Sequence, residues 1–321
     1  MPWTIFRGDG EQASPQPWEL IPPPPPWRRG QRPRTPFVAV PELVDAINAA
    51  LHLRRPLLLT GPPGSGKSSV IEVIARELAL GTVLRWHVTS KSTVKDALFD
   101  YDALGRLQAV QVAEATGTLR GPGDPMESHR DAYAIDRFVT LGPLGTALAS
   151  RDKPRAVLID EIDKSDLDLH GDLLNVFENG EFDIAPLVRN THRPTATYVV
   201  RGADGASYGV EGGTVQARHF PVIVMTSNGE RTLPAPFLRR CVSFRMPTPN
   251  AAFLSEVVAA HLGTVADTER ELIASVAARV QDGSTVAVDQ LLNVVHLLTG
   301  NTDPQLRQIL PALLLAEIGD Q

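Results

Sequence analysis

Short and long apolar segments alternate along residues 40–226 of the chain. Uninterrupted apolar runs, as at residues 57–59 and 222–225, are typical of parallel strands that are buried on both faces. Longer segments repeat apolar residues three and four positions apart, which indicates amphipathic helices. The predicted strands cover residues 56–60, 82–88, 155–159 and 222–226, and the predicted helices cover residues 40–53, 69–78, 95–100, 102–115, 142–150 and 167–179.

A hairpin and a change of pattern complete this outline. Residues 198–210 read as two short strands around Asp204-Gly205, a dipeptide that favours a tight hairpin turn. After residue 249 no strand pattern remains, and four helices are predicted at residues 251–262, 268–280, 286–298 and 304–318. Strands alternating with helices predict a three-layer α/β domain with a parallel sheet, followed by an all-α domain. We therefore expect an arm at residues 1–36, an α/β domain at 37–249 and a helical domain at 250–321.

A glycine-rich loop lies between the first predicted strand and the helix that follows it. Residues 61–68 fit the phosphate-loop pattern G-x-x-x-x-G-K-S, in the strand–loop–helix context that gives this pattern its meaning. Loop N–H groups and the helix N-terminus favour bound phosphate, which the lysine would contact, while the serine hydroxyl would bind Mg²⁺. The alternative is a glycine turn that binds nothing, and the correct flanks disfavour it. The predicted nucleotide-binding residues are Gly61, Pro62, Pro63, Gly64, Ser65, Gly66, Lys67, Ser68 and Ser69.

Two carboxylates end the predicted strand at residues 155–159. Asp160 and Glu161 follow four apolar residues, so they belong at the carboxyl end of a parallel strand, where open α/β sheets bind ligands. Asp160 would hold Mg²⁺ together with Ser68, and Glu161 would orient and deprotonate an attacking water. The alternative is a pair of solvated acids, but the phosphate loop upstream favours a catalytic role.

Polar groups after the strand at residues 222–226 extend this set. Asn228 lies at the strand tip, within reach of a γ-phosphate and a water, although asparagine before glycine is also common in simple turns. Arg239 and Arg240 follow closely and would suit an arginine finger on a neighbouring subunit's nucleotide. A solvated basic pair is the other interpretation of these arginines.

Composition limits the classes of function. A formal charge of -6 argues against a mainly nucleic-acid-binding protein. Cys241 is the single cysteine, which excludes an intrachain disulfide and a cysteine-based metal cage. No apolar run is long enough to cross a membrane and no apolar leader is visible, so we expect a cytoplasmic location without membrane association.

The arm at residues 1–36 differs from the remainder of the chain. It contains a run of five prolines and three of the four tryptophans, Trp3, Trp18 and Trp27. Prolines exclude regular helix and sheet and favour an extended path. The arm is either a disordered leader or a segment that buries its tryptophans against a neighbouring subunit or a partner.

These motifs, in this order and spacing, resemble those of AAA+ ATPases. The resemblance covers roughly residues 37–300, and the hairpin before residue 222 and the stretch Gly142-Pro143-Leu144 are similar to the MoxR-like branch. It implies a Walker A motif at residues 61–68, a Walker B motif at Asp160-Glu161, sensor 1 at Asn228 and an arginine finger at Arg240, or second at Arg239. It also implies ATP and Mg²⁺ as cofactors, a homo-oligomer that is most often a hexameric ring, and a protein partner that often has a von Willebrand factor A-type domain.

The chain departs from the family pattern at the lid. Residues 283–290 lack the sensor 2 arginine usual at the start of a lid helix, and Arg279 lies just before them in an unsuitable register. This affects the expected coupling of hydrolysis to lid motion. Residues 90–94 and the hairpin with Arg201 and Asp204 near its tip are candidate loops for engaging a target, while Tyr101 suits either a gripping role or a core role.

Two functions of different kinds agree with these observations. The first is a ring-forming ATPase that remodels a protein partner. The second is an ATP-gated assembly or signalling switch with slow hydrolysis, favoured by the missing sensor 2 arginine and the arm. A small-molecule kinase that shares only the phosphate loop does not account for the arginine pair and the helical tail.

Overall fold

The computed structural model of the 321-residue chain describes residues 5, 21–25, 37–115, 134–190, 196–263, 269–281, 288–299 and 303–315. The chain divides into two compact units. The sheet unit comprises Pro41–Thr60 and Lys67–Arg245, and the helical unit comprises Met1–Val40, Gly61–Gly66 and Met246–Gln321. The proline-rich arm falls largely outside the described residues, as does the glycine- and proline-rich break at residues 117–124.

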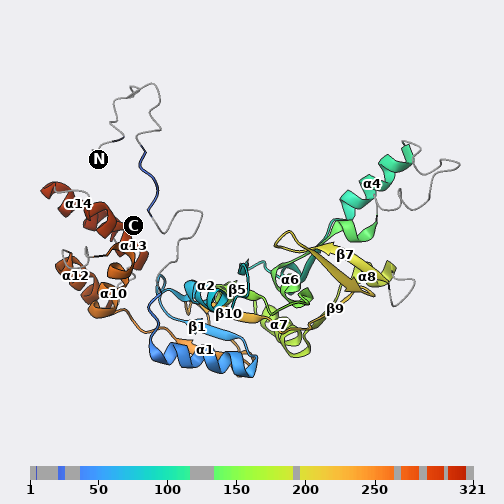
Figure 1. Cartoon of the computed structure of the whole chain (residues 1–321), viewed down its shortest axis with the longest axis horizontal. Coiled ribbons are helices and arrows are strands. Elements are labelled where there is room, and N and C mark those ends of the chain that lie inside the picture. Colours follow the sequence, from blue (N-terminus) through green and yellow to red (C-terminus); the bar gives the residue numbers. More distant parts are fainter. Residues whose placement is uncertain are drawn as a thin grey trace. The chain divides into compact units, whose positions relative to one another are not determined.

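The sheet unit contains a parallel sheet (Figure 1). Its five strands lie in the order β11-β1-β10-β5-β2, and every neighbouring pair is parallel. The register sets Thr60 beside Ser227 and His87 beside Asp160, so the carboxyl ends of the strands meet at one edge. The strands are β1 (Leu57–Thr60), β2 (Leu84–His87), β5 (Ala156–Asp160), β10 (Val222–Ser227) and β11 (Val242–Arg245).

Four of these strands match predicted ones, and the fifth was missed. Residues Leu57–Leu59 and the first four residues of β5 are buried, as expected for strands covered on both faces. Strand β11 alternates half-buried and exposed residues because it lies at the sheet edge. Its four residues, Val242–Arg245, alternate apolar and polar side chains, so no apolar run indicated it.

Helices cover the parallel sheet on its faces, giving the predicted α/β layers. Helix α1 (Pro41–Leu53) packs on β1 and β11, α2 (Lys67–Glu77) packs on β5 and β10, and α6 (Pro143–Ala149) packs on β2 and β5. Helix α7 (Leu167–Asn179) ends at Gly180, whose φ of 65° provides the left-handed cap that the sequence predicted.

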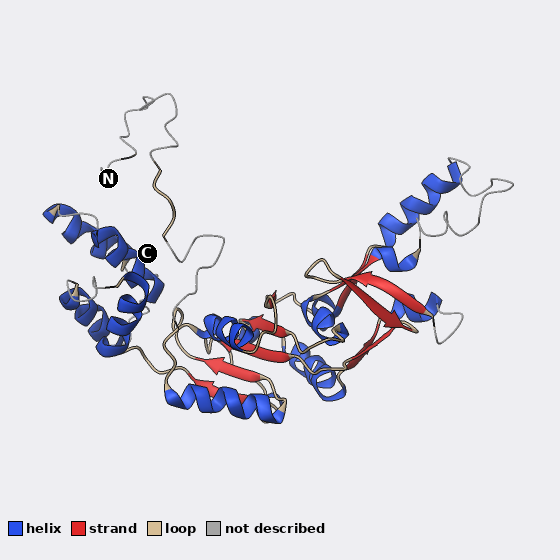
Figure 2. Ribbon diagram, in the orientation of Figure 1, coloured by secondary structure: helices blue, strands red, loops and turns tan. Residues whose placement is uncertain are grey.

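A second, mixed sheet is inserted into the sheet unit (Figure 2). Its order is β3-β4-β7-β8-β9-β6, and β7 (Thr197–Arg201) with β8 (Ser207–Glu211) is the predicted hairpin. The other strands, three residues each, are too short to show an alternating pattern and were missed: β3 (Phe99–Tyr101), β4 (Val139–Leu141), β6 (Glu181–Asp183) and β9 (Thr214–Gln216). The remaining helical elements of the sheet unit are α3 (Val94–Leu98), α4 (Ala103–Ala115), η4 (Ile135–Phe138), η5 (Ile162–Lys164), α8 (Ala185–Asn190) and α9 (Ala235–Leu238).

One hydrophobic core joins the two sheets. Leu58, Ile159 and Met225 of the parallel sheet belong to the same buried cluster as Phe182 and Val210 of the inserted sheet. The inserted sheet is therefore part of the same folded body.

The helical unit carries the predicted C-terminal helices. They are α10 (Ala251–Leu262), α12 (Arg270–Gln281), α13 (Val288–Thr299) and α14 (Pro304–Leu314), and they enclose a separate apolar cluster. Asn250 and Asp303 cap α10 and α14 by accepting backbone N–H groups. None of the helices described in either unit is both long and apolar enough to cross a membrane.

Candidate functional site

The phosphate loop has the backbone that its glycines predict. Gly61, Gly64 and Gly66 have φ values of 146°, 72° and 83°, a region in which side chains are strained. At Gly61 there is also little space, because a Cβ there would lie 3.1 Å from the Cβ of Met246. Ser65 turns the loop by donating from its N–H and hydroxyl to the carbonyl of Pro62.

Lys67 begins α2 and lies buried in the sheet unit. Its side chain is shielded from water, which lowers the pKa of the amine, while the carboxylates of Asp160, Asp163 and Glu161 act in the opposite direction. Lys67 thus lies in the field of the three acids, and the helix N-terminus adds partial positive charge beside it. The ammonium group suits a bound anion such as phosphate.

Asp160, at the carboxyl end of β5, accepts hydrogen bonds from two hydroxyl groups. Its Oδ1 accepts from Ser68 Oγ at 2.9 Å and from Thr226 Oγ1 at 2.5 Å. A serine from the phosphate-loop helix and the first acid of the strand are therefore in direct contact. Oxygen ligands of this kind are those that Mg²⁺ prefers.

Glu161 adopts a strained backbone directly after β5. Its φ of 61° and ψ of 48° are left-handed, which costs a residue with a side chain about 1 kcal/mol. The carboxylate is bound on both oxygens: Oε2 lies 2.8 Å from Lys164 Nζ and 3.3 Å from His87 Nε2, and Oε1 lies 3.4 Å from Asn228 Nδ2. The hydrogen bond to Glu161 raises the pKa of Lys164.

The sensor position follows β10 as predicted. Asn228 lies beside Glu161, and its backbone N–H donates to Asp163 Oδ2 at 3.1 Å. Asp163 is almost fully buried and also accepts the N–H of Glu230 at 2.9 Å. The acidic turn after β5 and the loop after β10 are thereby connected.

The two candidate finger arginines differ in their contacts. Arg240 Nε pairs with Glu178 of α7, and its Nη1 donates to the carbonyl of Pro236. Arg239 is exposed and forms no ion pair among the described residues. An arginine finger at Arg240 would first have to leave Glu178, whereas Arg239 needs no such release.

Arg279 has a structural contact in the helical unit. Its Nη2 donates to the carbonyl of Leu315 at 2.8 Å, which joins α12 to the end of α14. This agrees with its unsuitable register as a sensor 2 residue. Residues 282–287, at the predicted sensor 2 stretch, lie outside the described part of the chain.

The candidate target-engaging segments are only partly free. The hairpin turn is attached to the core, because Asp204 Oδ2 lies 2.7 Å from Arg155 Nη1 and the N–H of Ala203 donates to Thr146. Tyr101 packs on the main core and accepts a hydrogen bond from Arg106. Residues 90–93 remain largely exposed beside β2.

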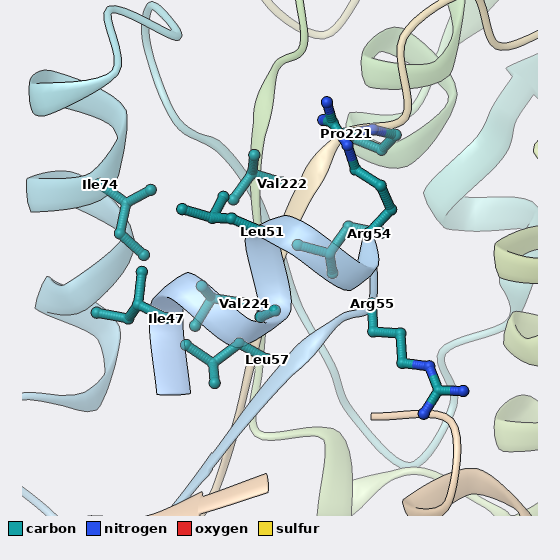
Figure 3. A pocket seen from close by; sticks show the side chains of 11 residues that line it. Ile47, Leu51, Arg54, Arg55, Leu57, Ile74, Pro221, Val222 and Val224 are labelled. Atoms are coloured by element: carbon teal, nitrogen blue, oxygen red, sulfur yellow. The ribbon is translucent and has the colours of Figure 1, made fainter. Parts of the chain in front are cut away.

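An apolar pocket lies away from these residues (Figure 3). Ile47 and Leu51 of α1, Ile74 of α2 and the first residues of β1 and β10 line it, with Arg54 and Arg55 nearby. Val222 and Leu57 begin their strands, whereas Ser227 and Thr60 end them, so the pocket is at the opposite strand ends from the acids.

The sequence patterns predicted that Asp160, Glu161, Lys67, Ser68 and Asn228 lie together, and the structure brings them together. The patterns did not indicate the residues that hold these groups in place. Thr226, Asp163 and His87 each contact a candidate catalytic group. Their positions at strand tips were a usable signal for Thr226 and His87. The contacts of Asp163 depend on how the loop after β10 folds, which no local pattern encodes.

Comparison with known protein families identifies the domain. The model of the AAA domain (dynein-related subfamily) matches residues 56–241. The chain belongs to this AAA family. The matched range holds the phosphate loop, both strand-tip acids, Asn228 and the arginine pair. No curated protein matches the chain.

Membership defines the class of activity. AAA+ domains are nucleotide-binding ATPases, and the parallel sheet with its strand-tip acids and separate helical unit has that architecture. The residues fit the expected cofactors: Ser68 and Asp160 form an oxygen pair suited to Mg²⁺, and the buried Lys67 suits the phosphates of ATP.

Proposed function

We propose that this chain hydrolyses ATP as a MoxR-like AAA+ ATPase and uses the reaction to remodel or activate a protein partner. The observation that carries the proposal is the contact of Glu161 with Asn228 beside the Asp160–Ser68 pair. A general base, a polar group beside it and a metal-binding pair are the parts that phosphoryl transfer to water requires.

Each residue has a defined part in this reaction. Glu161 orients the attacking water and accepts its proton, and Asn228 contacts that water and the γ-phosphate. Lys67 and the loop N–H groups of residues 61–66 bind the phosphates, with Ser69 following in the same helix turn. Mg²⁺, held by Ser68 and Asp160, supplies charge neutralisation at the phosphate oxygens when bound.

The MoxR-like assignment has two supports in the fold. The β7–β8 hairpin precedes β9 and β10 along the chain, and α6 begins at Pro143 after Gly142 and ends shortly before β5. We further propose a ring of identical subunits, hexameric by family resemblance, in which Arg240 or Arg239 completes the neighbour's site. A partner with a von Willebrand factor A-type domain fits this branch.

An ATP-gated switch with slow hydrolysis is the second candidate. Lys164 and His87 both contact the carboxylate oxygen Oε2 of Glu161, so the proposed base has two competing partners. The sequence also has no arginine in residues 283–290. Both features favour low turnover until a partner releases Glu161.

Mixing two inactive variants tests whether the site is shared. Glu161→Gln removes the base in its own subunit, and Arg240→Ala removes the proposed finger from the neighbour's site. In mixed rings, a subunit with intact Glu161 beside one with intact Arg240 has a complete site. We therefore expect turnover of the mixture to exceed that of either variant alone, measured as phosphate release in Mg²⁺-ATP.

The same assay separates the alternatives. A mixture that stays at the average of its two parents at every concentration contradicts a shared site with Arg240. Arg239→Ala, mixed with Glu161→Gln in the same way, is the matched control. If Arg240→Ala is active alone, the mixture with Arg239→Ala tests whether Arg239 is the finger. Rapid ATP binding with negligible turnover in the wild-type chain favours the switch.

A further inference from the structure

Asp163 occupies an unusual position beside the proposed catalytic residues. It lies in η5, two residues after Glu161, and its side chain is 1% exposed. Burying a carboxylate is costly unless it is paired or hydrogen-bonded, so its partners indicate its role. Asp163 is not among the residues that are proposed above to bind the nucleotide or the metal.

The partners of Asp163 come from the loop after β10. Its Oδ2 accepts the backbone N–H groups of Asn228 at 3.1 Å and Glu230 at 2.9 Å. The side chain thus acts on the backbone that carries Asn228, more than 60 residues away in sequence. Hydrogen bonds to an ionised acceptor are about twice as strong as neutral ones.

The acidic turn after β5 and the loop after β10 are joined a second time, here by a side chain of the loop that binds the backbone of the turn. Arg231, in the loop after β10, donates from Nη1 to the carbonyls of Lys164 at 3.4 Å and Ser165 at 3.3 Å in the acidic turn. Asp163 therefore binds the loop's backbone, and Arg231 binds the turn's backbone. The Asn228–Glu161 contact lies directly beside the Asp163–Asn228 bond, since Asn228 takes part in both.

We infer that Asp163 is a positioning residue that, with Arg231, fixes Asn228 against Glu161 for hydrolysis. The inference rests on the proposed function, because it deepens the roles of those two groups. A loop that shifts by about 1 Å can lower the rate of a reaction by about a hundredfold without contacting substrate. The clasp formed by Asp163 and Arg231 is expected to affect turnover and to leave the phosphate-loop contacts with ATP intact.

Substitutions at both ends of the clasp test this role. Asp163→Ala removes the oxygen that accepts both N–H groups, whereas Asp163→Asn can keep an oxygen in that place without the charge, so we expect kcat to fall about 100-fold and about 10-fold respectively. Arg231→Ala leaves no buried defect, since Arg231 is 58% exposed, and should lower kcat several-fold. The dissociation constant of a fluorescent ATP analogue should stay within about twofold, and Asp168→Asn, an exposed acid on α7, should behave as wild type.

Hydrogen exchange supplies a readout that does not depend on turnover. Asp163 holds the amides of Asn228 and Glu230, so exchange in the peptide spanning residues 226–232 should accelerate in both Asp163 variants and in Arg231→Ala. A kcat at the wild-type value despite accelerated exchange overturns the inference. If Asp163→Ala does not fold, an unchanged kcat in Arg231→Ala overturns it as well.

A parallel measurement keeps this inference separate from the proposed function. Glu161→Gln assayed beside the clasp variants reports on the base itself. If Glu161→Gln abolishes turnover while Asp163→Asn does not lower it, only the clasp is contradicted. If Glu161→Gln turns over at the wild-type rate, the proposed base is contradicted first.

Discussion

At the scale of single residues, Thr226 connects the tips of β10 and β5. Its hydroxyl donates to Asp160 and accepts the N–H of Glu161 at 3.0 Å, and the residue is 2% exposed. One buried hydroxyl therefore orients both the proposed metal ligand and the backbone of the proposed base.

Thr226→Val should lower turnover about 10-fold and destabilise the fold by about 1–3 kcal/mol, because the N–H of Glu161 loses its acceptor inside the protein. Valine has nearly the same shape, so packing changes little. Steady-state ATP hydrolysis and urea denaturation measure the two effects. Thr226→Ser keeps the hydroxyl and should retain most of the turnover and most of the stability. A Thr226→Val variant equal to wild type in both quantities would show that the hydroxyl has no role.

Cys241 provides a test of burial beside the arginine pair. Its thiol is buried and its Sγ lies 3.3 Å from the carbonyl of Phe237, and burial raises the pKa of the thiol to about 12. Only the thiolate reacts with alkylating reagents.

Iodoacetamide at pH 8 should therefore modify Cys241 of the native chain about a thousandfold more slowly than Cys241 of the urea-unfolded chain, where the pKa is ordinary. Mass spectrometry of timed samples gives both rates. The raised pKa means that slow modification persists well above pH 9. Equal rates would contradict the buried environment of Cys241.

Individual residues also show what the sequence could predict. Lys67, Ser68, Asp160 and Glu161 belong to local patterns whose strand and helix context is visible in the chain, so their meeting at one sheet edge was predictable. Asp163 and Arg231 exert their effects across the fold on backbone groups of a distant loop. Backbone partners carry no side-chain signature, so these contacts required the structure.

At the scale of elements, the β7–β8 hairpin is fixed at its turn. Asp204 accepts from Arg155 and from Tyr208 Oη at 2.7 Å, and Arg155 is the residue before β5. Burial alone would raise the pKa of the Asp204 carboxyl, but the hydrogen bonds from Arg155, Tyr208 and the N–H of Ala206 outweigh burial and lower it. The turn that the sequence suggests as a target-engaging tip is thus attached to the residue before the acid-bearing strand.

Asp204→Asn should lower the free energy of unfolding at pH 7 by about 2 kcal/mol, the scale of hydrogen bonds to a charged group. Because the folded pKa is depressed, this stability is present above the ordinary pKa of 3.8 and is lost as pH falls through the lower folded value. Urea denaturation of both chains should show a gap at pH 7 that narrows below pH 3.8. A gap that is absent at pH 7, or equally large in acid, would contradict the ionised pair.

Element length decided which elements could be predicted. The long helices and the buried strands of the parallel sheet have enough residues to show a period, and α7 carries its own stop signal at Gly180. Strands β3, β4, β6 and β9 have three residues each, and β11 lies at an edge. These strands exist because partners from distant parts of the chain pair with them, which overrides weak local preference.

At the scale of the whole molecule, most of the proposed catalytic groups belong to the sheet unit, while residues 61–66 of the phosphate loop are grouped with the helical unit. The sheet unit supplies Lys67, Ser68, Asp160, Glu161 and Asn228. The helical unit has its own core, and there the buried Glu269 pairs with the exposed Arg307. Among the hydrogen bonds and ion pairs of the described residues, none joins an arginine to Glu161. In the proposed ring, Arg240 or Arg239 of a second copy of the chain would supply the neutralising charge.

Steady-state hydrolysis of Mg²⁺-ATP over a range of protein concentrations, beside Glu161→Gln, shows whether Glu161 is the base and whether a neighbouring subunit completes the site. We expect turnover per subunit to rise with concentration, and Glu161→Gln to bind ATP as well as wild type but to release phosphate at least a hundredfold more slowly. Hydrolysis by Glu161→Gln at the wild-type rate would contradict Glu161 as the base. Turnover per subunit that is independent of concentration, down to dilutions at which only monomers are present, would contradict a site completed by a neighbour.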